Sequence, residues 1–227
     1  AGIAEEHALL LANGMSLEGL IPFVSIYSTF LQRGYDEVLH DITRMNSPVI
    51  LGIDRCGIVG EDGETHQGIY DLTFLMPLPN LIISAPKDSI EAGNLLYTAI
   101  LSKRPFAIRY SKDRLEYQKD NYQIIPIGSW ETITEGKDAV LITYGQFISN
   151  AKIIKEQLKD DIDLSIKQNN KSYCLDVVFA KKEIEYIYDL DLKQEIDINN
   201  AFYIRNSFRV EDNKLVRPTF TNAITPG

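Results

Sequence analysis

Four short apolar runs, separated by longer segments of helical character, are the feature that most constrains how this chain can fold. The runs lie at residues 23–27, 49–53, 81–85 and 106–110. Their length suits buried strands better than helices, which usually extend over ten or more residues. Strands that alternate with helical connections form mainly parallel sheets with helices packed on them. The sequence therefore predicts an α/β fold, a mainly parallel sheet with helices on both faces.

The connection after the first run carries a helical repeat. Its apolar residues recur at steps of three and four, at Leu31, Tyr35, Val38, Ile42 and Met45. This spacing places all five on one face of an α-helix, so we predict a single helix with that face buried.

The connection after the third run begins with a capping signal. Asp88 can cap a helix, and Glu91, three residues later, would complete a capping box. A shorter helical segment is expected between Leu72 and Leu78, before Pro79. The predicted apolar face of the longer helix consists of Leu95, Leu96, Ala99 and Ile100.

The second half of the chain has a weaker pattern. Residues 111–124 are polar and poor in β-branched side chains, as expected of a linker. A strand at 139–143 leads through Gly145 into an amphipathic segment that ends near Leu158, and a further strand is expected at 173–180. After about residue 181 the pattern has no clean periodicity.

Two domains are expected from the 227 residues, one at 1–118 and a smaller α/β domain at 119–227. The formal net charge is −9, of which −6 falls in the first domain and −3 in the second. Because neither half is basic, the charge argues against a nucleic-acid partner and against an anionic membrane surface. Small phosphorylated substrates stay possible, since two or three local cations suffice to bind them.

Cysteine use and hydropathy suggest where the protein works. Cys56 and Cys174 lie in different halves without a CxxC spacing, which is typical of a reducing, cytoplasmic compartment. No apolar run approaches the roughly 18 residues of a membrane-spanning helix, so no membrane span is expected.

Polar and aromatic segments follow the first, second and fourth runs. The sequence YSTFLQRGYD occupies residues 27–36, DRCG and GEDGETH occupy 54–57 and 60–66, and RYSK occupies 109–112. Parallel strands end at one edge of a sheet, and ligands of open α/β sheets gather there. We therefore expect these segments to meet in one site. Taken alone, a glycine-rich charged loop such as 54–68 is as compatible with a solvated connection.

These segments, with GIAEEHA at residues 2–8, resemble the pyrimidine-side half of thiamine-diphosphate enzymes, and most closely the 1-deoxy-D-xylulose-5-phosphate synthase family. The specific motifs extend to residue 112, and residues 130–158 resemble the start of a transketolase-type C-terminal domain more loosely. The resemblance implies a transketolase-type pyrimidine-binding domain at 1–118. It also implies thiamine diphosphate and Mg²⁺ as cofactors. The implied reaction condenses pyruvate with glyceraldehyde 3-phosphate to 1-deoxy-D-xylulose 5-phosphate and CO2.

By this resemblance, Glu5 is the catalytic carboxylate that bonds a ring nitrogen of the cofactor's aminopyrimidine. Phe30 would stack on that ring, with Tyr27 and Arg33 flanking the same pocket. Without the resemblance, Glu5 and its neighbour Glu6 would be interpreted as first-turn acids that a helix dipole favours. Glu6 departs from the family, which usually has Gln at this place.

Substrate binding is expected of Tyr27, Arg55, Asp62, His66 and Lys112. Arg55 would grip the phosphate with its fork of donors, and Asp62 would hold substrate or its own loop. His66 would also be catalytic, as a proton shuttle near neutral pH. Lys112 replaces the second Arg of the family's RYPRG pattern, so the charge is kept and the bidentate geometry is lost.

Arg109 has two interpretations, a compensating phosphate donor or a strand-end charge. No metal site is expected within this chain, and the spacing of Asp62-Gly63 and Asn94, which imitates a magnesium motif, is interpreted as coincidence. The Mg²⁺ ligands are expected outside this chain segment.

The chain opens inside the first motif, so the resemblance implies a diphosphate-binding domain supplied by another part of the polypeptide or by a partner. A homodimer is expected, and the chain alone is expected to be inactive. Two alternatives stay open. The chain could be the C-terminal subunit of a split transketolase, or a non-catalytic relative that keeps the fold for assembly.

Overall fold

The computed structural model describes residues 1–113 and 121–168 in full, and the backbone of residue 169. Beyond them it describes the backbone of five short strands: β8 (Val178–Lys181), β9 (Ile187–Asp189), β10 (Gln194–Ile196), β11 (Arg209–Glu211) and β12 (Lys214–Val216). The chain divides into two compact units, the first built mainly from residues 1–131 and the second mainly from residues after 131. Each is described by itself.

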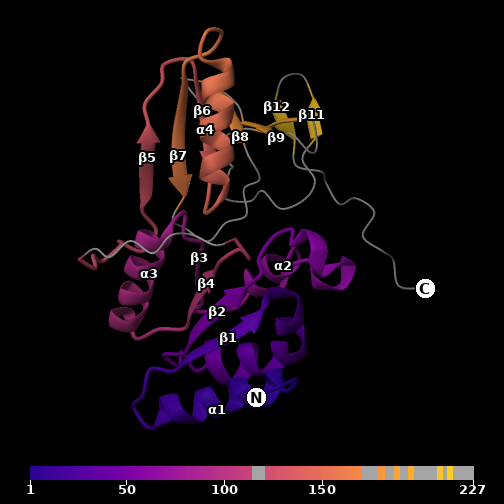
Figure 1. Ribbon diagram of the computed structural model, residues 1–227, viewed down its shortest axis with the longest axis vertical. Helices are drawn as coiled ribbons and strands as arrows, with labels where there is room; N and C mark the ends of the chain where they lie inside the picture. The colour runs from indigo at the N-terminus through magenta and orange to yellow at the C-terminus, as the bar shows by residue number, and fades with distance from the viewer. Residues whose placement is uncertain are drawn as a thin grey trace. The chain divides into compact units, whose positions relative to one another are not determined.

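The first unit is built on a four-stranded parallel sheet (Figure 1). Its strands, in spatial order, are β1 (Phe23–Tyr27), β2 (Ile50–Asp54), β4 (Phe106–Arg109) and β3 (Ile82–Ser84). All neighbouring pairs are parallel, and the register pairs Tyr27 with Asp54 and Ile53 with Arg109. The predicted strands therefore all form, with bounds that differ from the prediction by at most one residue at either end.

Helical elements cover both faces of this sheet. On one face, α1 (Glu5–Leu17), the 3-10 helix η1 (Ser28–Gly34), the π-helix η2 (Glu37–Thr43) and the short α2 (Asp71–Leu75) share a core with the strands. On the other, α3 (Ser89–Ser102) packs on a second core. Side chains alternate along the strands, so Ile50 faces α3 while Leu51 faces the opposite core. The predicted α/β fold is confirmed.

The helix predicted from Leu31 to Met45 has the expected buried face but not one regular pitch. Leu31, Val38 and Ile42 are fully buried, yet the segment passes from a 3-10 helix to a π-helix. Met45 lies after the π-helix has ended and is 53% exposed, so its assignment to the buried face is wrong. Periodicity identified the buried face, but apolar steps of three and four residues could not distinguish one α-helix from a 3-10 helix followed by a π-helix.

Asp88 caps α3 as predicted, because its carboxylate accepts the amide of Glu91 at 2.8 Å. The reciprocal bond differs from a capping box: the Glu91 carboxylate accepts the amide of Lys87, at 2.6 Å, and its second oxygen takes the ammonium of the same residue. Leu95 and Ala99 are buried, whereas Leu96 and Ile100 are exposed, so the predicted face is only half correct.

The second unit contains a six-stranded mixed sheet in the order β10-β9-β8-β6-β7-β5. The predicted strand–turn–helix is confirmed as β6 (Ala139–Thr143) followed by α4 (Phe147–Leu158). β6 pairs parallel with β7 (Leu164–Asn169) and antiparallel with β8.

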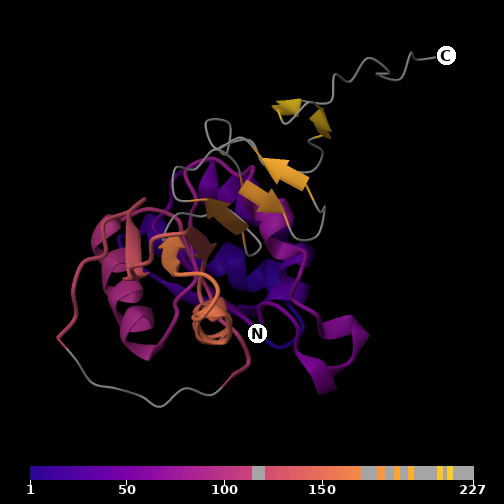
Figure 2. The ribbon, with the colours of Figure 1, turned by 90° about the horizontal axis from the view of Figure 1, so that it is seen from above.

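The remaining strands of this unit were less visible in the sequence. β5 (Trp130–Thr134) and β7 were not predicted. Of the strand predicted at 173–180, residues 178–180 belong to β8 and the earlier ones lie outside the described residues. The antiparallel pair β11–β12 is the last described segment (yellow in Figures 1 and 2). In the part of the chain that the structure describes, no helix is long and apolar enough to cross a membrane.

Candidate functional site

The carboxyl ends of β1, β2 and β4 bring the predicted site segments together. Tyr27 and Asp54 are the last residues of β1 and β2 and lie opposite each other in the register. Arg109 ends β4, which pairs with β2, and Lys112 follows three residues later. All three strands are parallel, so the loops after them open at one edge of the sheet.

Glu5 is the first residue of α1 and points inward. Only 9% of Glu5 is exposed, and its Oε1 accepts a hydrogen bond from Nη1 of Arg33 at 3.0 Å. Its Oε2 is buried without a hydrogen-bond partner among the described residues. The neighbouring Glu6 is exposed. A helix dipole alone would favour an acid in this first turn at the surface, whereas a buried carboxylate oxygen without a donor is costly.

Aromatic rings lie next to this carboxylate. Tyr27 and Phe30 stack with ring centroids 5.6 Å apart and planes 12° from parallel. The guanidinium carbon of Arg33 lies 4.8 Å from the centroid of Phe30, and His66 meets the same ring edge-on at 5.3 Å. Arg33 therefore joins Glu5 to Phe30, through an ion pair on one side and a cation–π contact on the other.

Arg55 is held in a fixed position above Tyr27. Its backbone has φ 56°, in the left-handed region, and its guanidinium carbon lies 3.9 Å from the ring centroid of Tyr27. Asp54 accepts from both the amide and Nη1 of Arg55, each at 2.6 Å, and Asp62 accepts from Nε at 3.2 Å. Desolvation opposes the charge of this guanidinium, but Asp54, Tyr27 and Asp62 outweigh it and raise the pKa of Arg55.

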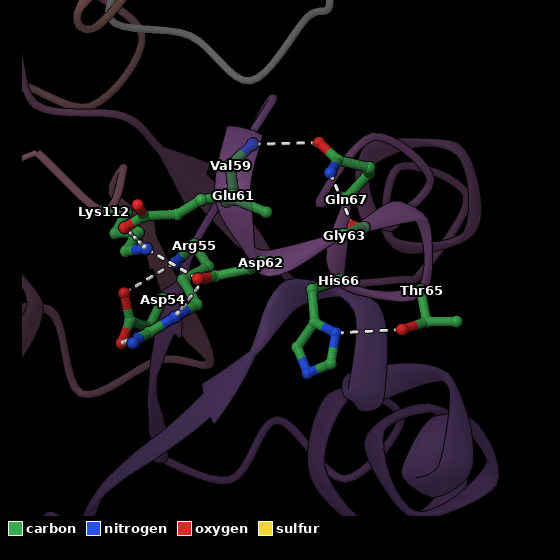
Figure 3. A network of polar contacts seen from close by, with 10 residues as sticks. All are labelled: Asp54, Arg55, Val59, Glu61, Asp62, Gly63, Thr65, His66, Gln67 and Lys112. Carbon is green, nitrogen blue, oxygen red and sulfur yellow. Dashed lines mark hydrogen bonds and ion pairs between the residues drawn. The ribbon is translucent and has the colours of Figure 1, made fainter.

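Lys112 completes an ionic network with the loop after β2 (Figure 3). Its ammonium lies 2.6 Å from Oδ1 of Asp62 and 3.0 Å from Oε1 of Glu61. The hydrogen bond from Lys112 lowers the pKa of the Asp62 carboxyl, and the bonds to Asp62 and Glu61 raise the pKa of Lys112. Asp62 thus bridges Lys112 and Arg55, one oxygen to each.

His66 sits beside the rings with a defined orientation. Its Nδ1 lies 2.9 Å from the hydroxyl of Thr65, whose carbonyl in turn accepts from the hydroxyl of Thr29 in η1 at 3.1 Å. These contacts tie the loop after β2 to the segment after β1. The imidazole is only partly buried and keeps one nitrogen for another partner.

The residues named from the sequence form one continuous set of contacts. From Glu5 the set passes through Arg33 to Phe30, which touches both His66 and Tyr27. From Tyr27 it continues to the ionic network, which contains Arg55, Asp62 and Lys112 from the predicted set.

Comparison with known proteins assigns this chain to a family. The family described as "Transketolase, pyrimidine binding domain" matches residues 1–118. The chain belongs to this family. The likeness to 1-deoxy-D-xylulose-5-phosphate synthase is also confirmed: the enzyme of Bacillus cereus (strain AH820) is 47% identical over 192 residues, which are 83% of this chain and 30% of that protein. The enzyme of Listeria welshimeri is 49% identical over 164 residues, 70% of this chain and 26% of that protein. The chain thus spans less than a third of the length of these curated relatives.

Solved structures share the fold. A split-gene transketolase, described as an inactive beta4 tetramer, superimposes with a TM-score of 0.66 at 25% identity, over 75% of this chain and 56% of that one. A transketolase from Leishmania mexicana gives a TM-score of 0.64 at 22% identity, over 75% of this chain and 26% of that one. The second likeness shows the fold alone.

Arg109 does not join the site of this transketolase-type domain. It is 7% exposed, and its Nε and Nη2 donate to the two oxygens of Asp71 at 2.6 and 2.9 Å. Burial opposes its charge, but Cys56 and Asp71 outweigh that and raise the pKa of Arg109. The interpretation of Arg109 as a compensating phosphate donor is wrong, because its side chain is buried and its Nε and Nη2 already bind Asp71 inside the core.

Sequence reasoning missed the partner of Arg109. Asp71 is fully buried at the start of α2, and its Oδ2 also accepts from the thiol of Cys56 at 3.6 Å. Burial raises the pKa of that thiol. An acid in the first turn of a short apolar helix was the one available signal, but such an acid normally indicates a cap rather than a buried ion pair.

No group of His, Cys, Asp or Glu within the described residues could hold a metal ion. The pair that imitates a magnesium motif has other partners in this pyrimidine-binding domain. Asp62 is bound to two cations, and Oδ1 of Asn94 accepts the amide of Gln123 at 2.9 Å.

Proposed function

We propose that this chain supplies the pyrimidine side of the thiamine-diphosphate site of a 1-deoxy-D-xylulose-5-phosphate synthase. The reaction condenses pyruvate with glyceraldehyde 3-phosphate and gives 1-deoxy-D-xylulose 5-phosphate and CO2, a precursor for isoprenoid, thiamine and pyridoxal biosynthesis. The identity of 47% to such a synthase over 83% of the chain supports this choice of reaction. The carrying observation in the structure is the buried, unpartnered carboxylate oxygen of Glu5.

The residues around Glu5 fit the pyrimidine end of this cofactor. Oε2 of Glu5 needs a donor, and a protonated ring nitrogen would supply one. Phe30 offers an aromatic ring on the other side of Arg33. When bound, thiamine diphosphate supplies the stabilisation of the carbanion that pyruvate leaves on losing CO2. Glu5 holds the proton at the ring nitrogen, and its burial keeps that proton from exchanging with water.

The ionic network is the proposed place for the substrate phosphate. Arg55 and Lys112 are the cations that would bind it, with Tyr27 and Asp62 shaping the place between them. His66 contacts the ring of Phe30 and would exchange a proton with the sugar oxygen. Charged hydrogen bonds to phosphate are stronger than neutral ones, so two cations suffice for affinity.

We infer that residues 1–118 form the pyrimidine-binding domain and that residues 119–227 form a partial or divergent transketolase-type C-terminal domain. The diphosphate and Mg²⁺ would be held by a further domain or subunit, and the assembled enzyme would be a cytoplasmic homodimer. The coverage of only 30% of the synthase supports the need for such a partner. Without it, the chain is expected to be inactive.

An assay of the assembled enzyme tests this function. The chain is combined with the diphosphate-binding part of a related synthase, and pyruvate and glyceraldehyde 3-phosphate are added with thiamine diphosphate and Mg²⁺. If the assembled enzyme is a synthase, we expect CO2 release together with formation of the ketose phosphate. The likeness to a split-gene transketolase favours one alternative, which predicts exchange of ketol units between sugars without CO2. If the chain is a non-catalytic relative, we expect neither reaction.

A further inference from the structure

Two carboxylates of the loop after β2 occupy the cations proposed to bind phosphate. We propose that Glu61 and Asp62 are built-in competitors of the incoming anion, and that Glu61 sets how tightly that anion binds. The inference rests on the proposed function for the choice of Arg55 and Lys112 as the phosphate-binding cations and for naming a sugar phosphate as the anion.

Asp62 engages both cations at once. Its Oδ1 lies 2.6 Å from the ammonium of Lys112 and its Oδ2 lies 3.2 Å from Nε of Arg55 (Figure 3). A carboxylate that bridges two cations, one oxygen to each, uses the donors that a phosphate would use. An anion that takes these same two donors must displace the carboxylate from at least one of them.

The charge balance of the network opposes a dianion. Arg55 and Lys112 carry two positive charges, and three carboxylates contact them, leaving a net charge of −1. Asp54 is fixed at the end of β2 and binds Arg55 twice, through the amide and the guanidinium. The displaceable negative charges therefore belong to Glu61 and Asp62.

The local backbone lets these two side chains leave without disrupting the loop. They lie in the 3-10 turn Gly60–Asp62, which has no buried residue. The turn begins at Gly60, with φ of 56°, and is followed by Gly63, with φ of 84°. The side chain of Gln67 spans the turn, accepting from the amide of Val59 at 2.9 Å and donating to the carbonyl of Gly63 at 2.7 Å. The ends of the turn are thus held by Gln67 while its acidic side chains rotate.

Of the two carboxylates, Glu61 is the more exposed and is held by fewer ion pairs. Its side chain is 86% exposed, against 22% for Asp62, and Lys112 is its one ion-pair partner among the described residues. Exposed ion pairs are weak, so losing this one shifts the affinity for a competing anion by about two- to fivefold. A lysine at position 112 makes the competition effective, because its single ammonium must be shared among all acceptors.

The test is a titration of the 227-residue chain with inorganic phosphate at constant ionic strength, followed by the NMR amide signals of residues 60–63. Glu61→Gln is compared with Glu64→Gln, which removes the same charge from an exposed neighbour in the same loop. Glu64 has no ion pair within the described part of the chain. Glu61→Gln is expected to tighten the apparent Kd about two- to fivefold relative to Glu64→Gln. Lys112→Gln is expected to weaken it.

Equal Kd values for Glu61→Gln and Glu64→Gln would overturn the inference, because the effect would then be one of general charge. A titration in which neither the parent chain nor Glu61→Gln shows a saturable response, or one that Lys112→Gln leaves unchanged, would overturn it too. The readout requires no turnover. An assembled enzyme that fails to make the ketose phosphate therefore contradicts the proposed function while leaving this comparison decisive.

Discussion

Arg109 and Asp71 form a bidentate ion pair inside the core of the first unit, with N–O distances of 2.6 and 2.9 Å. Asp71 is fully buried, and its thiol neighbour Cys56 directly follows Arg55 in the chain. The pair therefore lies beneath the loop that carries the proposed phosphate-binding residue. A buried pair of this kind adds little over an apolar contact, but losing one partner leaves the other charged and unpaired.

Asp71→Asn is expected to lower the free energy of unfolding by about 3–5 kcal/mol, because it leaves Arg109 as a buried charge without its counterion. Urea denaturation followed by circular dichroism measures the change. Asp36→Asn is the matched control, since Asp36 is 82% exposed and its ion-pair partner within the described residues is the surface residue His40. A loss below about 1 kcal/mol for Asp71→Asn would contradict the energetic role of the pair.

Glu5→Gln is expected to reduce kcat of the assembled enzyme by about 100-fold or more, since an amide cannot hold the acidic proton at the ring nitrogen. The fold should persist, because the Gln oxygen can still accept from Arg33. Glu6→Gln removes the same charge from the adjacent exposed position and should keep most of the turnover. Turnover of Glu5→Gln close to the parent level would refute the role of Glu5.

Lys112→Arg is expected to lower KM for glyceraldehyde 3-phosphate by about two- to fivefold, because a guanidinium can bind Asp62 and phosphate with separate donors. Lys103→Arg provides the control at the exposed end of α3. Steady-state kinetics with pyruvate held saturating give both values. An unchanged or higher KM for Lys112→Arg would show that the lysine is not the weaker phosphate ligand.

Gly68→Ala is expected to destabilise the loop after β2 by about 1–3 kcal/mol. An added Cβ would lie 2.1 Å from the carbonyl oxygen of Arg55 and 2.9 Å from the Cα of Cys56, and this backbone cannot move aside cheaply. Gly14→Ala is the contrasting change in α1, where an added Cβ meets nothing within 4 Å. This substitution should stabilise the folded protein by about 0.5–1 kcal/mol, because alanine favours a helix more than glycine does. Thermal unfolding of both variants, with opposite signs of the shift in Tm, checks the prediction.

Cys56 is expected to resist alkylation in the folded protein up to about pH 9. Burial raises the pKa of its thiol, so the reactive thiolate is scarce over the whole range in which a free cysteine, with a pKa of about 8.5, ionises. Iodoacetamide labelling from pH 7 to 9, read by mass spectrometry of the peptide that contains Cys56, measures this. The unfolded chain should be labelled with the ordinary pH dependence, and labelling of the folded chain at the same rate would contradict the burial.

Local patterns were sufficient for most elements of the first unit. Short, mainly apolar runs marked each parallel strand, and Asp88 marked the start of α3. The same reasoning failed where an element departs from regular pitch, as in the π-helix that ends before Met45. It also failed at α3, where Leu96 and Ile100 carry an apolar pattern but remain exposed.

For the candidate site, the sequence predicted which residues take part but not all of their partners. Glu5, Tyr27, Phe30 and Arg33 were chosen from motifs, and they lie in contact. The partners within the loops were not predictable, because an ion pair such as Lys112 with Glu61 joins residues 51 positions apart. Nothing in either short segment specifies the other.

The amino-acid sequence by itself determined the parallel α/β sheet and the edge at which polar residues collect, because strand length, helical repeat and capping are properties of neighbouring residues. Only the tertiary structure decided how the charges are used. It buries Arg109 against Asp71, 38 positions away, and it places the Asp62 carboxylate between Arg55 and Lys112, where it forms an ion pair with each. These pairings depend on which loops meet where parallel strands end, and that meeting is set by the packing of the whole sheet.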